Sequence, residues 1–161
     1  MRRPEKSRPA EDFPRFDSLE QEAYLNLWRT YDRLKAIEEA LFSAHDLTAQ
    51  QYNALRLLRA AHPGTLQTLD LASRLISRAP DITRLLDKLE QRGLVWRERP
   101  AENRRVVTVG ITSAGLELLD ELVEPVRECH KQQLGHLSEI ELTQLIRLLK
   151  AGRRPHETPG R

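Results

Sequence analysis

The 161 residues are enough for one domain with extended arms, and a hydrophobic content of 39% is adequate for a single core. The 26 basic and 24 acidic residues leave a net charge of +2, so the total charge indicates no partner and only its distribution is informative. A single cysteine excludes an internal disulfide framework, and no apolar run approaches the ~18 residues that span a bilayer. We therefore expect a cytoplasmic protein without a membrane partner.

Both ends of the chain have the composition of flexible arms. Residues 1–16 place three prolines among charged side chains, and residues 152–161 read GRRPHETPGR. Because no apolar stretch follows the basic residues of the N-terminus, we do not expect a signal peptide there.

Two helices are predicted before residue 62. The first runs from about Leu19 to Ala44, with Asp17 or Ser18 as its N-cap. Its apolar stripe is wide enough to face both its own core and another subunit. In the second helix, Thr48 and Gln51 form a capping box, and the helix continues to about Ala61.

The stretch from Leu66 to Thr112 is the most informative part of the chain. It reads as two short helices joined by a tight turn, followed by a β-hairpin with a basic tip. The second short helix has Pro80 in its first turn and Gly93 just past its end, where Leu94 can fold back on Leu89 in a Schellman motif.

This second short helix has one apolar and one polar face. The apolar positions fall at helical spacing on one side: Ile82, Leu85, Leu86 and Leu89. The other side is polar and partly basic: Asp81, Thr83, Arg84, Asp87 and Lys88. One face therefore packs against a core while the other remains available to a partner.

Positive charge is concentrated in the same region. Residues 74–105 hold nine basic and five acidic side chains, a net of +4, whereas the rest of the chain sums to −2. Each hairpin arginine taken singly is best explained as solvated surface. The four together, beside a helix-turn-helix pattern, favour binding to double-stranded DNA: Arg97, Arg99, Arg104 and Arg105.

Two more helices are predicted after the hairpin. A long one begins at Thr112 and passes through Val126, with a kink expected at Pro125. The last begins at Ser138, where Glu141 closes a capping box. The predicted fold is thus mainly α with a small β-hairpin wing. A winged helix-turn-helix domain at 47–111 lies between dimerisation helices at 17–46 and 112–151, with flexible arms at 1–16 and 152–161.

This order of elements resembles the MarR family of bacterial transcription regulators, over roughly Leu19 to Ala151. The most specific match is DITRLLDKLEQRGLVWRERPAENRRVVTVGIT, which follows the family's recognition-helix pattern xVTRLxDxLExxGLV. The family's wing motif Asp-Arg-Arg appears here as Asn103-Arg104-Arg105. Asn103 can accept a hydrogen bond but carries no charge, so the wing tip is expected to be less rigid than in the family.

The resemblance implies a homodimer that reads an inverted repeat, with each recognition helix in a major groove and each wing in a flanking minor groove. Most members repress nearby genes and release DNA when a small aromatic or anionic effector binds. Others respond to peroxide through a thiol, and some activate. No cofactor is implied.

The expected DNA contacts divide by role. Thr83 and Arg84 are expected at base edges, with Ala79, Pro80 and Asp81 at the start of the helix. Asp81 either accepts from a cytosine amine, caps its own helix or positions Arg84, and Arg84 could instead pair with Asp81 or Asp87. Arg105 is expected in the minor groove, with Arg104 as the alternative. Phosphate contacts are expected from Ser73, Arg74, Ser77, Arg78 and Lys88.

The effector pocket is expected near the first, second and fifth helices, with Trp28, Tyr31, His45 and Tyr52 as candidate lining residues. Each of these residues, taken singly, is better explained in another way: Trp28, Tyr31 and Tyr52 as core or interface, and His45 as a helix-end residue. Cys129 is a redox candidate, although an inert thiol is the favoured interpretation. The five histidines show no metal-ligand spacing.

Two other functions compete with a ligand-responsive DNA-binding regulator. One is a winged-helix module that docks protein, and the other is a redox-responsive regulator that uses Cys129. No motif indicates an enzyme, because a phosphate loop, a nucleophile elbow and an acid-histidine cluster are all missing from the sequence.

Overall fold

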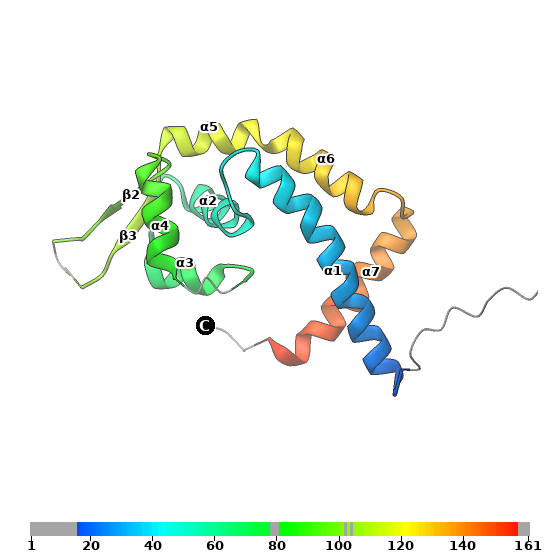
Figure 1. The fold of residues 1–161 in the computed structure, drawn as a ribbon. Coiled ribbons are helices and arrows are strands. Elements are labelled where there is room, and N and C mark those ends of the chain that lie inside the picture. Colours follow the sequence, from blue (N-terminus) through cyan, green and yellow to red (C-terminus); the bar gives the residue numbers. More distant parts are fainter. Residues whose placement is uncertain (1–15, 78–80, 102, 104, 158–161) are drawn as a thin grey trace, which may run out of the picture. The chain divides into compact units, whose positions relative to one another are not determined.

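The computed structural model describes residues 16–77, 81–101, 103 and 105–157, which fall into two compact units divided after Leu34. The structure is mostly helical with a small antiparallel sheet, which confirms the predicted fold class (Figure 1). The elements in chain order are α1 (Leu19–Ser43), α2 (Ala49–Ala61), β1 (Leu66–Gln67), α3 (Thr68–Arg74), α4 (Ile82–Gln91), β2 (Val95–Glu98), β3 (Thr108–Ile111), α5 (Ser113–Glu121), α6 (Val123–Leu134), α7 (Glu139–Arg153) and the 3₁₀ turn η1 (Arg154–His156).

Three helices begin at capping residues that were predicted from the sequence. Ser18, and not Asp17, caps α1, because its Oγ accepts from the backbone N–H of Gln21 at 3.1 Å. Complete capping boxes begin α2, at Thr48 and Gln51, and α7, at Ser138 and Glu141. In each box the N-cap side chain and the third helical residue satisfy one another's backbone N–H groups, so both predicted starts are confirmed.

The sheet has three strands in the order β1-β3-β2, one more than the predicted hairpin. β2 and β3 form that hairpin, with Arg97 opposite Val109. β1 adds only two residues, with Leu66 opposite Val109, and so ties the start of α3 to the base of the wing. A two-residue strand is too short to show an alternating pattern, which is why the sequence did not reveal it.

The predicted long helix after the wing is two helices, α5 and α6, that follow each other in one curved run (Figure 1). The interruption is at Leu122, three residues before Pro125. Proline lacks an N–H and its ring crowds the carbonyl four residues earlier, which here belongs to Glu121, the last residue of α5. The predicted kink is therefore confirmed, and it is displaced toward the N-terminus by that crowding.

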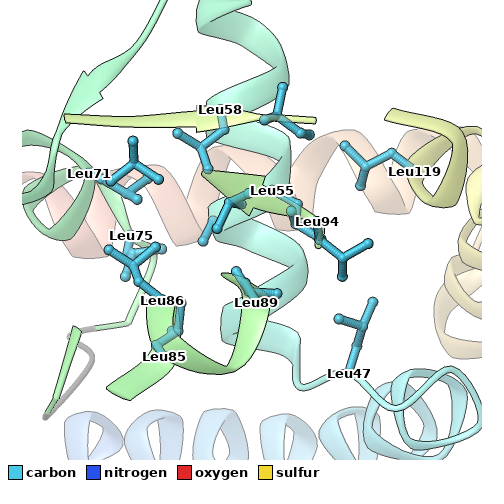
Figure 2. Close-up of a cluster of buried hydrophobic side chains, with 14 of the residues drawn as sticks. Leu47, Leu55, Leu58, Leu71, Leu75, Leu85, Leu86, Leu89, Leu94 and Leu119 are labelled. Carbon is cyan, nitrogen blue, oxygen red and sulfur yellow. The ribbon is translucent and has the colours of Figure 1, made fainter. Parts of the chain in front are cut away.

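The core lies within the unit of residues 35–161 and is built mainly from leucines (Figure 2). Leu55 and Leu58 of α2 meet Leu86 and Leu89 of α4, all at most 1% exposed. Each fully buried leucine contributes about 1.5–3 kcal/mol relative to an exposed one. The apolar face predicted for the second short helix therefore packs, and its polar face is left outside.

The helices α1 and α7 each keep several apolar side chains exposed. In the unit that ends at Leu34, the exposed residues of α1 include Tyr24, Leu27, Trp28 and Tyr31. In α7 no residue is buried, and Ile140, Ile146, Leu148 and Leu149 are exposed. The segment from 152, predicted as a flexible arm, begins inside α7 and continues into η1. No helix in the described part of the chain is long and apolar enough to cross a membrane.

Candidate nucleic-acid interface

Both ends of α4 are closed by local hydrogen bonds. At its start, Asp81 Oδ1 accepts from the backbone N–H of Arg84 at 2.9 Å, so Asp81 caps its own helix. At its end, Gly93 has a φ of 68°, and the N–H of Leu94 donates to the carbonyl of Leu89 at 3.0 Å. The N–H of Gly93 donates to the carbonyl of Glu90, which completes the predicted Schellman motif.

The outer face of α4 carries the predicted base-reading residues. Leu85, Leu86 and Leu89 are buried, whereas Thr83, Arg84 and Lys88 are exposed. The turn before α4 is hydrogen-bonded to α2, since the N–H of Ile76 donates to Asn53 Oδ1 of α2 at 3.0 Å. The predicted phosphate contacts Ser73, Arg74 and Ser77 are exposed on α3 and this turn.

Several predicted contacts lie outside the described residues, namely Arg78, Ala79, Pro80 and Arg104. At the described part of the wing tip, the N–H of Arg105 donates to Asn103 Oδ1 at 3.2 Å. Asn103 thus accepts a hydrogen bond, as expected, and the Arg105 side chain is exposed.

A hollow of about 390 Å³ lies where α4, the start of α3 and the wing meet. Two exposed arginines, Arg99 and Arg105, line it beside Thr83. Gln67, Thr68 and Leu69 complete one side. Their place in the hollow depends on β1, a strand that the sequence pattern does not reveal. The lining is Gln67, Thr68, Leu69, Thr83, Leu86, Arg97, Arg99, Arg105, Val106 and Val107.

Two basic residues of the +4 region bind acceptors within the protein. Arg97 donates to Asp87 and Glu90 of α4, and its hydrogen bonds hold the pKa of Glu90 below the usual value. Arg92 donates to the carbonyl oxygens of His45 and Asp46. The number of basic side chains available to a partner is therefore smaller than the nine that the sequence places in this region.

Of the four effector candidates, Tyr52 lines a groove within its unit. The groove, of about 710 Å³, lies between α2 and the α5–α6 pair, and basic side chains surround an apolar floor. Tyr52 stacks on Phe42 with ring centroids 4.6 Å apart. The lining is Tyr52, Arg56, Arg59, Ala60, Leu119, Val123, Val126, Arg127 and His130.

The other three candidates lie elsewhere. His45 is half-buried at the end of α1, and Trp28 and Tyr31 are exposed in the unit that ends at Leu34. The groove arginines Arg56 and Arg59 were missed, although their spacing from Tyr52 by four and seven residues places all three on one helix face.

Cys129 is buried in α6, and burial, together with the nearby charge of Glu38, raises the pKa of its thiol. Since the thiolate is the reactive form, this environment favours the inert thiol over the sensing one. Within the described ranges, no group of three His, Cys, Asp or Glu side chains could hold a metal ion.

The comparisons with known proteins agree on one family. The model of the MarR family matches residues 47–107. A crystal structure of a MarR transcription factor from Planctomyces limnophilus is 64% identical and covers 85% of this chain and 99% of that one, with a TM-score of 0.69.

Two curated relatives are named HTH-type transcriptional regulators. YkoM of Bacillus subtilis is 31% identical over 140 residues, which cover 84% of this chain and 89% of YkoM. FarR of Neisseria gonorrhoeae is 40% identical over 83 residues, and that match spans 56% of FarR.

Proposed function

The chain belongs to the MarR family of transcription regulators, and we propose that it represses transcription by binding a specific double-stranded DNA operator as a homodimer. The observation that carries the proposal is the exposed face of α4, where Thr83 and Arg84 lie beside a hollow lined by Arg99 and Arg105. A helix backed by a packed core and flanked by a basic hairpin has the form needed to enter the major groove.

Relatives support both DNA binding and repression. A crystal structure of MepR of Staphylococcus aureus, 26% identical with a TM-score of 0.72, is a complex with DNA. MprA of Escherichia coli, 28% identical over 142 residues, is named a transcriptional repressor.

Base reading is proposed for Arg84 and Thr83. Arginine can donate two hydrogen bonds to guanine O6 and N7, and threonine offers a hydroxyl and a methyl group. Asp81 caps α4 and so sets the start of the helix that presents these side chains. Pro80 was expected in the first turn of this helix, but α4 begins at Ile82, so Pro80 precedes the cap and remains a proposed DNA contact. Phosphate contacts, which position the protein without specifying sequence, are proposed for Ser73, Arg74, Ser77, Arg78 and Lys88.

For the wing we propose Arg105 as the side chain that enters the minor groove, with Arg104 as the alternative. A narrow minor groove has a strong negative potential, which attracts an inserted guanidinium group. Arg105 is exposed, and its N–H donates to Asn103 Oδ1.

The homodimer is proposed from the exposed apolar residues of α1 and α7. A 15-residue helix with no buried residue, such as α7, gains little from its own chain, so covering it with a second copy would supply the missing burial. Two lobes related by a two-fold axis would read an inverted repeat with half-sites about 10 base pairs apart.

The effector is proposed to be a small aromatic anion bound in the groove between α2 and the α5–α6 pair. Tyr52 and the floor of Leu119, Val123 and Val126 suit an aromatic ring, and Arg56 and His130 suit a carboxylate. We assign Trp28 and Tyr31 to the proposed dimer interface and not to the effector pocket. His45 is assigned to the end of α1. In a relative that is 27% identical, BpsR of Bordetella bronchiseptica, 6-hydroxynicotinic acid regulates DNA binding.

The test is selection of duplexes from a random-sequence pool, followed by sequencing. A regulator that reads an operator will enrich one inverted repeat, and aromatic carboxylates can then be screened for release from it. Retention of the pool without enrichment would contradict sequence-specific binding and favour a winged helix that docks protein.

A further inference from the structure

Arg97 connects the wing to the recognition helix α4. Although Arg97 lies in β2, its side chain reaches back to two carboxylates of α4. Its Nη2 donates to Asp87 Oδ1 at 2.6 Å, and its Nε donates to Glu90 Oε2 at 3.0 Å. The Nη2 group also donates to the same Glu90 oxygen. One planar guanidinium therefore binds two acids that lie three residues apart on one helix.

The surroundings of Arg97 differ from those of the other wing arginines. The side chain of Arg97 is 22% exposed, whereas Arg99 and Arg105 are exposed residues on the surface. One positive and two negative charges leave the cluster of Arg97, Asp87 and Glu90 at −1. A side chain bound in this way has few N–H groups left for a phosphate, and its charge is already neutralised.

The cluster of Arg97, Asp87 and Glu90 is one of two connections between α4 and β2. Only three residues, 92–94, separate the end of α4 from the start of β2. This turn is the covalent connection between the two elements. The second connection is made by the side chain of Arg97, which binds Glu90 and Asp87, seven and ten residues before it in the sequence. Two connections fix the angle between a helix and a hairpin, whereas one connection permits rotation.

We propose that Arg97, Asp87 and Glu90 form a positioning clamp that sets the angle of the wing to α4, and that Arg97 does not neutralise a DNA phosphate. This inference rests on the proposed function, because the angle matters only if α4 and the wing contact one duplex together. The clamp lets both elements reach adjacent grooves without an ordering cost on binding.

For the variant Glu90→Gln, the clamp predicts a change in DNA affinity opposite to the change expected from charge alone. Replacing Glu90 by glutamine removes a negative charge near DNA, which by charge alone strengthens binding. The clamp predicts weaker binding, because glutamine is a poor partner for a guanidinium group that Asp87 alone must then hold. Charge alone therefore predicts tighter DNA binding by Glu90→Gln, whereas the clamp predicts weaker binding.

The first experiment measures affinity for the selected duplex at salt concentrations between about 50 and 300 mM. Glu90→Gln is expected to weaken binding by roughly tenfold, as loss of a charged hydrogen bond would. Glu98→Gln removes the same charge from a wing residue outside the clamp, and it should bind as well as wild type or better. Tighter binding by Glu90→Gln, as for Glu98→Gln, would overturn the proposal.

The salt dependence separates positioning from phosphate contact. Arg97→Gln should lose affinity while the slope of log K against log salt stays at the wild-type value. Arg74→Gln, at a proposed phosphate contact, should lower the magnitude of the slope by about 0.9, as expected for one lost phosphate interaction. A lower slope for Arg97→Gln would identify Arg97 as a DNA contact and end the clamp interpretation.

A third measurement needs no DNA. The chain has two tryptophans, so Trp28→Phe leaves Trp96, the neighbour of Arg97 in β2, as the sole fluorophore. In this background Arg97→Gln and Glu90→Gln should increase the nanosecond mobility of Trp96 in time-resolved anisotropy, and Glu98→Gln should not. Unchanged mobility in Arg97→Gln would exclude a clamp. If no duplex is enriched, the proposed function fails, and this measurement still decides whether the clamp exists.

Discussion

The guanidinium of Arg92 donates to the carbonyl oxygen of Asp46 at 2.6 Å, which joins the residue after α4 to the turn after α1. A second bond, to the carbonyl of His45 at 3.2 Å, holds the same turn. Asp46 is the one described non-glycine residue with a positive φ, 53°. The recognition helix is therefore held at its end by a turn whose backbone is itself constrained.

Arg92→Ala should destabilise the protein. It removes two hydrogen bonds from a charged donor, and because the site is exposed, the expected loss is about 1–2 kcal/mol in the free energy of unfolding. Urea denaturation measures this loss. Lys88→Ala, which removes an exposed basic side chain on the same helix, should stay within about 0.5 kcal/mol of wild type. Equal effects of the two substitutions would contradict the role given to Arg92.

Gly93→Ala should cost about 1–2 kcal/mol, because an L-residue is strained in the left-handed conformation that ends α4. Nothing lies within 4 Å of the position where the added Cβ would stand, so the cost is one of backbone conformation alone. Gly152→Ala is the matched control, since it also adds a methyl group in open space but on the helical backbone of α7. There the substitution should be neutral or stabilising, by up to about 1 kcal/mol. Thermal denaturation that ranks the two variants in the opposite order would refute this interpretation.

Gly110→Ala should disturb the wing for a different reason. A methyl group at Gly110 of β3 would overlap the indole of Trp96 on β2, with Nε1 at 2.6 Å. The indole must move, so we expect a shift in Trp96 fluorescence and a loss of stability of about 1–3 kcal/mol. In a double-mutant cycle, Trp96→Ala should remove most of the cost. Additive effects would show that the contact is not the cause.

The pH dependence of stability should reveal the pair of Glu90 and Arg97. The Arg97 hydrogen bond holds the pKa of Glu90 below 4.5, so the carboxylate is favoured in the folded state. Its stabilising effect is fully present above about pH 4.5 and is lost as the pH falls through the lower folded-state pKa. Wild type should therefore exceed Glu90→Gln in stability at pH 7, with the difference shrinking in acid. In an Arg97→Gln background that pH dependence should disappear; its persistence would assign the lowered pKa to another group.

Arg84→Ala should relax sequence preference by roughly 1–3 kcal/mol at one base position of each half-site. Arg105→Ala should instead weaken binding to many sequences alike. Binding of single-base operator variants distinguishes the two outcomes. If Arg105→Ala lost discrimination at one position only, its assignment to the wing would need to change.

Local sequence signals predicted the features that depend on neighbouring residues. The capping boxes at Thr48 and Ser138 marked helix starts, and Gly93 marked the end of α4, because each depends on hydrogen bonds within a few positions. The exposed face of α4 followed from helical periodicity in the same way.

Features that depend on distant residues were not predictable. The pairing of Leu66 with Val109 creates β1 from two residues that have no pattern of their own. Arg97 looked like Arg99 and Arg105 in the sequence, and its partners on α4 become visible only when the hairpin folds back. A count of basic residues along the chain therefore overestimated how many of them a partner can meet.

The most direct test of sequence-specific DNA binding uses the DNA immediately upstream of the protein's own coding region, at fixed salt, against excess unrelated duplex. We predict binding to that DNA at least about a thousandfold tighter than to the competitor, as specific regulators show. Binding to the upstream DNA no tighter than to the competitor, together with a random pool that yields no enriched repeat, would contradict the account.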